Sequence, residues 1–180
     1  VSTPQVSPAA VGTATHLVMQ RIDLANGQID TATIRALIQQ LVTDKMIDEK
    51  VAPLISVTKI QRFFTESVLG QQMVQHANTL KREVPFSLLL DANRLYRNFD
   101  GDDKVLVHGI IDGYFQVGDE VWLFDYKTDH VKPAQAATTL KQRYAGQINI
   151  YSQALIAMGL AVPRKFIYAL NAETLIELTN

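Results

Sequence analysis

Two β-rich runs joined by one short turn constrain the fold of this chain more than any other feature. The runs cover residues 105–115 and 121–126, and Gly118 and Asp119 between them form a typical turn sequence. A two-residue hairpin loop at this turn places Asp112 directly opposite Asp125 on neighbouring strands. A slip of one residue in the register would separate the two acids.

Asp112 and Asp125 would be like charges at facing positions of this hairpin, and such pairs destabilise a sheet. A bound cation turns that repulsion into coordination, since hard divalent metals prefer carboxylate oxygens. Lys127 is two residues beyond Asp125 and therefore shares its face of the strand. This trio can hold a metal and position a water molecule against a phosphodiester. The alternative interpretation is a set of solvated charges with no ligand.

The segment from Pro133 to Met158 has the spacing of apolar residues that is typical of a helix. Gln147 and Tyr151 are four residues apart and lie on one face of this helix. Amide, phenol and basic groups beside the acidic motif indicate a site for a phosphate backbone, in which Tyr144, Lys141 and Arg143 also take part. Ordinary core packing explains the two tyrosines equally well when they are considered alone.

Basic residues surround the acidic motif although the formal net charge of the chain is −1. Asp129 is the only acid between residues 126 and 143. A local basic patch can attract a phosphate backbone despite a neutral total charge, but a solvated helix end would have the same composition. The patch consists of Lys127, Lys132, Lys141 and Arg143.

Five short motifs occur in a fixed order along most of the chain. They are Gly12-Thr13-Ala14-Thr15-His16, Arg82-Glu83-Val84-Pro85-Phe86, Gly109-Ile110-Ile111-Asp112, Asp125-Tyr126-Lys127-Thr128, and Gln147 with Tyr151. The last three resemble the RecB-type nuclease signature of the PD-(D/E)XK superfamily. The first two resemble the GTxxH and REvPF segments in the nuclease domain of AddA-type (RexA) helicase–nucleases. The resemblance implies a metal-dependent deoxyribonuclease.

The resemblance also implies a role for most residues of these motifs. Asp112 and Asp125 would be ligands of Mg²⁺ or Mn²⁺, together with the backbone carbonyl of Tyr126 and the side chain of His16. Lys127 would orient the attacking water and offset charge on the phosphate. Gln147 and Tyr151 would support the lysine and the DNA strand, whereas Glu83 receives no catalytic role.

The histidine ligand has two candidates. The resemblance favours His16, in an amphipathic segment over residues 13–24 that we expect to form the first helix. Strand alternation instead puts His108 on the same face as Asp112, which makes it a rival ligand. A histidine ligand suits Mn²⁺ better than Mg²⁺, so the identity of the metal stays open.

The composition excludes several classes of protein. Without cysteine the chain has no disulfide and no cysteine-ligated zinc or iron–sulfur cluster, which favours the AddA-type branch over AddB-type and Cas4-type nucleases. It contains no GK[ST] phosphate loop, so it is not itself an ATP-driven motor. No apolar run is long enough for a membrane span, and we expect a bacterial cytoplasmic, nucleoid-associated location.

The order of expected elements indicates an α/β sandwich with a mixed sheet. Residues 1–11 are interpreted as a linker and residues 12–180 as a single domain, a C-terminal fragment of a longer helicase–nuclease. Asp100 to Asp103 is expected to close a hairpin. The β-β-β-α-β run matches the core order of the restriction-endonuclease-like (PD-(D/E)XK) fold, which the resemblance also implies. Further helices are expected over 31–43, 44–51, from 56 and over 70–80, and strands over 83–90, 94–99, 105–115, 121–126, 165–170 and 174–178.

These features together predict a nuclease that hydrolyses single-stranded DNA in double-strand-break end resection and recombinational repair. Its expected partners are DNA, the helicase portion of the same parent chain and a second subunit of the AddB/RexB type. One alternative is a non-catalytic DNA-guiding scaffold, although guiding requires positive charge and not paired acids. Another is a standalone Cas4-like or phage-type exonuclease, which the linker-like start and the lack of cysteine disfavour.

Overall fold

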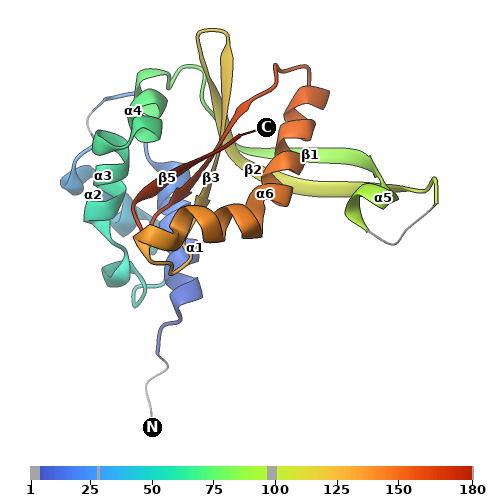
Figure 1. Cartoon of the computed structure of the whole chain (residues 1–180). Coiled ribbons are helices and arrows are strands. Elements are labelled where there is room, and N and C mark those ends of the chain that lie inside the picture. Colours follow the sequence, from blue (N-terminus) through green and yellow to red (C-terminus); the bar gives the residue numbers. More distant parts are fainter. Residues whose placement is uncertain (1–4, 28, 97–100, 180) are drawn as a thin grey trace.

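A five-stranded mixed sheet forms the centre of the molecule (Figure 1). The computed structural model describes residues 5–27, 29–96 and 101–179. All neighbouring strands are antiparallel except β3 and β4, which are parallel because α6 (Pro133–Ala157) crosses between them. In their order across the sheet the strands are β1 (Lys81–Asp91), β2 (Lys104–Val117), β3 (Glu120–Lys127), β4 (Arg164–Ala169) and β5 (Thr174–Leu178).

The β2–β3 hairpin has the register that the sequence predicts. Its ladder runs from Val117 opposite Glu120 to Gly113 opposite Phe124, with a two-residue loop between the strands. Gly118 has φ of 60° in this loop, a conformation that glycine adopts without steric cost. The expected hairpin is therefore confirmed.

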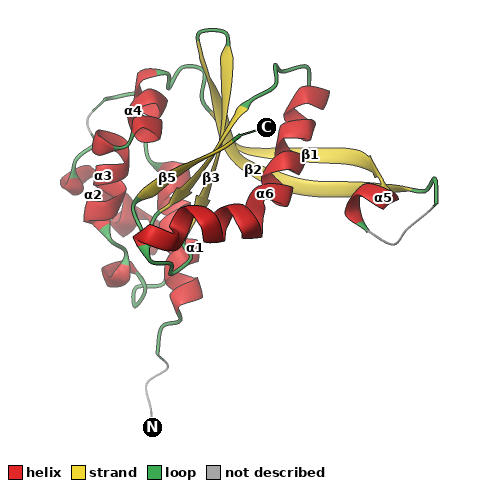
Figure 2. Ribbon diagram, viewed as in Figure 1, coloured by secondary structure: helices red, strands yellow, loops and turns green. Residues whose placement is uncertain are grey.

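Helices cover both faces of the sheet and create two separate hydrophobic layers (Figure 2). On one face, Phe115, Phe124 and Tyr168 pack against Phe63 and other residues of the N-terminal helices. The other face packs on α6, the longest helix. None of the helices in the described part of the chain is long and apolar enough to cross a lipid bilayer. The N-terminal helices are α1 (Pro8–Arg21), α2 (Thr31–Thr43), η1 (Ala52–Leu54), α3 (Val57–Glu66) and α4 (Val68–Gln75).

Three helical expectations need correction. The first helix begins at Pro8 and not at residue 13, because Ser7 caps it and proline suits a first turn; residues 8–11 are thus helical rather than linker. Over 44–51 the chain makes turns, since Lys45 has φ of 58° and ends α2. The helix expected over 70–80 begins at Val68, where Ser67 provides the cap.

One strand expectation is wrong. Part of the segment 94–99 belongs to α5 (Ala92–Leu95), a short helix at the end of the arm formed by β1 and the first half of β2 (Figure 1). The backbone nitrogen of Ala92 donates to the carbonyl of Asp103, which closes the arm. Residues 97–100 lie outside the described residues, so the expected turn at Asp100 is only partly covered.

Candidate metal centre

Asp112 lies where the sheet opens on both sides of β2. The β1–β2 ladder omits the position at which Glu83 would face Asp112. The β2–β3 ladder stops at Gly113 and Phe124, one position short of Asp112 and Asp125. Beyond this point β3 pairs with β4 alone. The two facing acids of the predicted hairpin therefore sit at its frayed end, where side chains from other elements can enter.

Glu83 is the functional candidate to which sequence reasoning assigned no role. Its φ of 54° is uncommon for a residue other than glycine. Potential ligand atoms of Glu83, His16 and Asp112 all lie within 4.8 Å of one another. Burial raises the pKa of Glu83, and the nearby charge of Asp112 adds to the increase. The match of Glu83 to the REvPF motif was the only signal of this placement in the sequence.

His16 reaches the site because α1 approaches the end of β3 closely. A Cβ on Gly12 would lie only 2.5 Å from the hydroxyl oxygen of Thr128, so a larger residue there would push α1 away. One turn further, Nε2 of His16 lies 2.9 Å from Oδ1 of Asp112. The pKa of His16 is raised: burial lowers it, but contact with the Asp112 carboxylate more than offsets this effect.

Arg82 fixes the other end of α1. Its guanidinium donates to the backbone carbonyls of Ile22 at 2.7 Å and Met19 at 3.4 Å, which the helix itself leaves unsatisfied. Burial lowers the pKa of Arg82. Since Arg82 precedes Glu83 in the chain, one short segment of β1 both anchors α1 and supplies the third carboxylate.

Asp125 and Lys127 share one face of β3, as predicted. Nζ of Lys127 lies 2.7 Å from Oδ2 of Asp125 and donates to Oε1 of Gln147 at 2.8 Å. The same ammonium lies 4.0 Å from the ring centre of Tyr144. Burial and then the charge of Asp112 raise the pKa of Asp125 to about 7, although Lys127 acts in the opposite direction.

Tyr126 connects the two acidic positions through its backbone. Its amide nitrogen donates to Oδ2 of Asp112 at 2.7 Å. Its buried ring lies on the α1 side, edge-on to the ring of His16 with centroids 5.8 Å apart. The amide therefore orients Asp112, and the ligand role of the Tyr126 carbonyl stays a prediction.

Tyr151 is part of the core between α6 and the sheet. Its ring packs against Phe86 with centroids 5.5 Å apart, and Phe86 in turn lies over Gly109, where a Cβ would be 2.6 Å from the Phe86 ring. Burial, followed by the charges of Asp125 and Asp112, raises the pKa of Tyr151 to about 12. The phenol thus stays protonated near the acids, and Gly109 leaves space for this packing.

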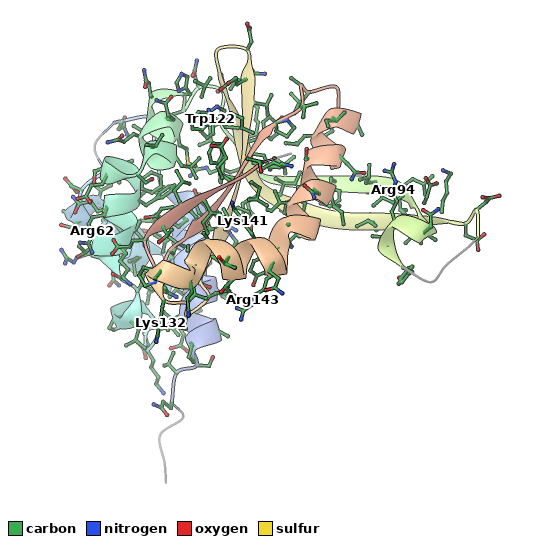
Figure 3. The ribbon with its side chains drawn as sticks, viewed as in Figure 1. Arg62, Arg94, Trp122, Lys132, Lys141 and Arg143 are labelled. Atoms are coloured by element: carbon green, nitrogen blue, oxygen red, sulfur yellow. The ribbon has the colours of Figure 1, made fainter. Side chains whose placement is uncertain are left out.

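The basic patch is weaker than the sequence indicates. Arg143 pairs with Asp129 at 2.9 Å, and Asp129 also accepts from the hydroxyl of Tyr144. Figure 3 shows Lys132, Lys141 and Arg143 along α6. Lys132 and Lys141 are exposed, whereas Arg143 and Lys127 each contact a carboxylate.

His108 does not lie in the site. It is exposed on the arm, and its Nδ1 is 2.8 Å from the hydroxyl of Ser87. The alternation argument was wrong because alternation is interrupted at Asp112: Ile111 and Tyr114 both pack toward α6 although they are three residues apart. Of the two candidates, only His16 is brought to the acids.

Two buried polar atoms test whether these residues suit a cation. Nε2 of His16 and Oδ2 of Asp125 make no hydrogen bond of acceptable geometry within the described residues, although each has a charged neighbour at ion-pair distance. Buried polar atoms normally have such partners. Nitrogen and oxygen donors of this kind suit Mg²⁺ or Mn²⁺, so the residues fit a divalent metal.

A family model agrees with this geometry. The model described as the PD-(D/E)XK nuclease superfamily matches residues 2–176. The chain belongs to the PD-(D/E)XK nuclease superfamily. The five-stranded mixed sheet with flanking helices is consistent with the restriction-endonuclease-like fold of this family, as the five motifs predicted.

This PD-(D/E)XK domain is also similar to part of several much longer proteins, each named as the AddA-type subunit of an ATP-dependent helicase/nuclease. It is 44% identical to the protein from Pediococcus pentosaceus over 174 residues, which cover 94% of the chain and 14% of the relative. For Lacticaseibacillus casei the identity is 48% over 83% of the chain and 12% of the relative. For Enterococcus faecalis it is 40% over 96% and 14%. The chain thus spans about a seventh of the length of these relatives.

Proposed function

We propose that this PD-(D/E)XK domain is a metal-dependent deoxyribonuclease that cuts single-stranded DNA delivered by a helicase. The observation that supports it most is the meeting of His16, Glu83 and Asp112 directly beside the Asp125–Lys127 pair. These groups come from α1, β1, β2 and β3, and no single element of the sequence would bring them together. Such convergence in a buried opening is typical of a catalytic site.

His16, Glu83, Asp112 and Asp125 would hold the cation, with the carbonyl of Tyr126 as a further ligand. When bound, a divalent cation polarises the phosphoryl oxygens and makes a water molecule more acidic. The amide of Tyr126 holds the Asp112 carboxylate in one orientation. This preorganisation limits the cost of assembling the site when substrate arrives.

Lys127 would act on the substrate rather than on the metal, because an ammonium has no lone pair for a ligand bond. Asp125 and Gln147 fix its Nζ from two sides, and the Tyr144 ring lies alongside. From this position Lys127 orients the attacking water and offsets negative charge on the phosphate. A fixed cation is most effective in a buried site, where water screens it least.

The names of the relatives support a motor as the source of the strand. We propose that the domain receives single-stranded DNA from the helicase part of a longer polypeptide, with an AddB/RexB-type protein as second subunit, during end resection for recombinational repair. Lys132 and Lys141 are the exposed cations of the patch, so the domain alone binds DNA weakly. Delivery by a motor compensates for this weak binding.

A DNA-guiding scaffold without catalysis is the second candidate, and the buried acids argue against it. Asp112 and Asp125 are both buried, and their mutual repulsion contributes to the raised pKa of Asp125. A guiding surface would gain nothing from this arrangement, because carboxylates repel the phosphate backbone.

A comparison of matched substrates tests the proposal. The isolated domain should cut single-stranded DNA slowly and distributively with Mg²⁺ or Mn²⁺, and blunt duplex far more slowly. ATP should change neither rate, and a chelator should abolish both. Fast, processive degradation of blunt duplex would favour the standalone exonuclease, and DNA binding without any cleavage would favour the scaffold.

A further inference from the structure

We propose that a cavity beside the metal centre binds one unstacked base of the DNA strand being cut. This inference rests on the proposed nuclease function and deepens it. The cavity has a volume of about 270 Å³ and lies between the first turns of α1, η1, the segment after β3 and the turn between β4 and β5. None of the catalytic groups lines it.

The cavity is adjacent to the proposed site along two separate segments of chain. Thr15 lines it and directly precedes His16, and Thr128 lines it and directly follows Lys127. Neighbouring Cα atoms are about 3.8 Å apart, so the cavity begins within roughly one nucleotide of the phosphate to be cut. It also lies past the carboxyl ends of the parallel strands β3 and β4, where open α/β sheets commonly bind ligands.

The walls of the cavity suit a base better than a phosphate. Val11 and Leu54 provide apolar surface, and Thr15, Thr128 and Asn171 provide uncharged polar groups. No lysine, arginine or carboxylate is among the described residues that line it, so a phosphate would find no counter-charge there. A base has apolar faces and a hydrogen-bonding edge, which match both kinds of wall.

The polar rim is already ordered without a ligand. The side-chain amide of Asn171 donates to the carbonyl of Thr128, and the carbonyl of Asn171 accepts from Nζ of Lys59 at 2.7 Å. The hydroxyl of Thr15 donates to the carbonyl of Val11 at 2.8 Å, so its oxygen can accept from a base. With a volume below the usual ligand-pocket range of roughly 300–1,000 Å³, the cavity has room for one base and not for a longer segment.

Abasic substitution in single-stranded DNA tests the proposal with the unaltered protein. Oligonucleotides of uniform sequence that carry one abasic site are digested with Mg²⁺, and every cut is mapped on a denaturing gel. We expect cleavage to fall about five- to hundredfold at one phosphate, at a fixed offset from the abasic site, as for the loss of one stacked base.

A cavity-filling variant locates the effect. Leu54 is 53% exposed, so Leu54→Trp can fill the cavity with little disturbance of the core. It should weaken cleavage of intact DNA and abolish the dip at the abasic site, while hydrolysis of bis(p-nitrophenyl) phosphate, which has no base, stays unchanged. Met46→Trp is the matched control, because Met46 is 45% exposed and does not line the cavity; it should retain the wild-type pattern.

The outcomes separate this inference from the function on which it rests. Uniform cleavage around the abasic site by an active wild-type protein would overturn the base site and leave the nuclease proposal intact. A dip that persists in Leu54→Trp would place the base elsewhere and overturn the assignment of this cavity. Absence of any metal-dependent cleavage by the wild-type protein would overturn both.

Discussion

The two ends of the β2–β3 pair differ more than any other neighbouring regions of this molecule. At the turn end, five consecutive residue pairs form a regular ladder between Val117 and Gly113 on β2 and their partners on β3. At the other end, the ladder stops and Asp112 faces His16 and Glu83 instead. The same two strands therefore serve as scaffold at one end and as candidate active site at the other.

The difference lies in what satisfies the backbone and the charges. At the turn end, strand-to-strand hydrogen bonds do so. At the site end, the amide of Tyr126 bonds to a side chain of β2, and Glu83 adopts an uncommon backbone conformation. Such departures cost stability and persist where the surrounding structure enforces them, which is common at functional sites. If the site end is an active site, substitutions there should affect cleavage far more than substitutions elsewhere.

Removal of either acid should have the largest effect. Asp112→Ala and Asp125→Ala should each lower DNA cleavage by more than about a thousandfold, beyond the loss typical of one supporting electrostatic group. Cleavage assays with Mn²⁺ measure this effect, and a rate near that of the wild type in either variant would exclude the assignment.

The two variants should differ in metal-free stability, and this difference sharpens the comparison. Asp125→Ala removes a buried charge and should leave the Tm equal or higher. Asp112→Ala leaves the buried amide of Tyr126 unsatisfied, at a cost of about 1–3 kcal/mol, and should lower the Tm. Thermal unfolding in the presence of a chelator tests both expectations.

Lys127→Ala should lower the cleavage rate about a hundredfold to a thousandfold and retain most of the metal affinity. Its ammonium contacts Asp125 and Gln147 but has no means of coordinating a cation. Lys141→Ala is the control, because Lys141 is an exposed lysine of α6 and should change the rate little. Loss of Mn²⁺ binding by calorimetry in Lys127→Ala would contradict the role given to this lysine.

The two histidines should separate clearly. His16→Ala should weaken Mn²⁺ binding at least about tenfold, in line with the effect of groups that support a metal site. His108→Ala should leave it unchanged, since His108 lies on the arm and contacts Ser87 there. The opposite order in calorimetric titrations would place the cation on the other side of β2.

The smallest expected effect is the pH dependence of metal-free stability. The folded-state pKa of Asp125 is about 7, above its ordinary value of 3.8, so the folded protein binds more protons than the unfolded chain between these values. Stability should therefore fall as pH rises from about 4 to 7 and then level off for this group. Asp125→Asn should remove most of this dependence in denaturant titrations. The raised pKa of His16 adds a loss of the same sign at higher pH.

Local patterns predicted the parts of the fold that local forces determine. The hairpin register, the cap of α2 at Asp30, the length of α6 and the shared face of Asp125 and Lys127 all follow from spacing and turn residues. The strand expected over 94–99 was wrong because its apolar residues match a strand pattern equally well, while closure of the arm at Ala92 favours a helical turn.

By itself, the sequence determined the α/β architecture, the family, and the adjacency of Asp112, Asp125 and Lys127, because these depend on periodicity and on one short turn. Only the tertiary structure decided between His16 and His108 and brought in Glu83. Their placement depends on contacts between elements distant in the chain: Gly12 packs against Thr128, and Arg82 holds the end of α1. Alternation along a strand cannot predict a site at which that alternation is broken.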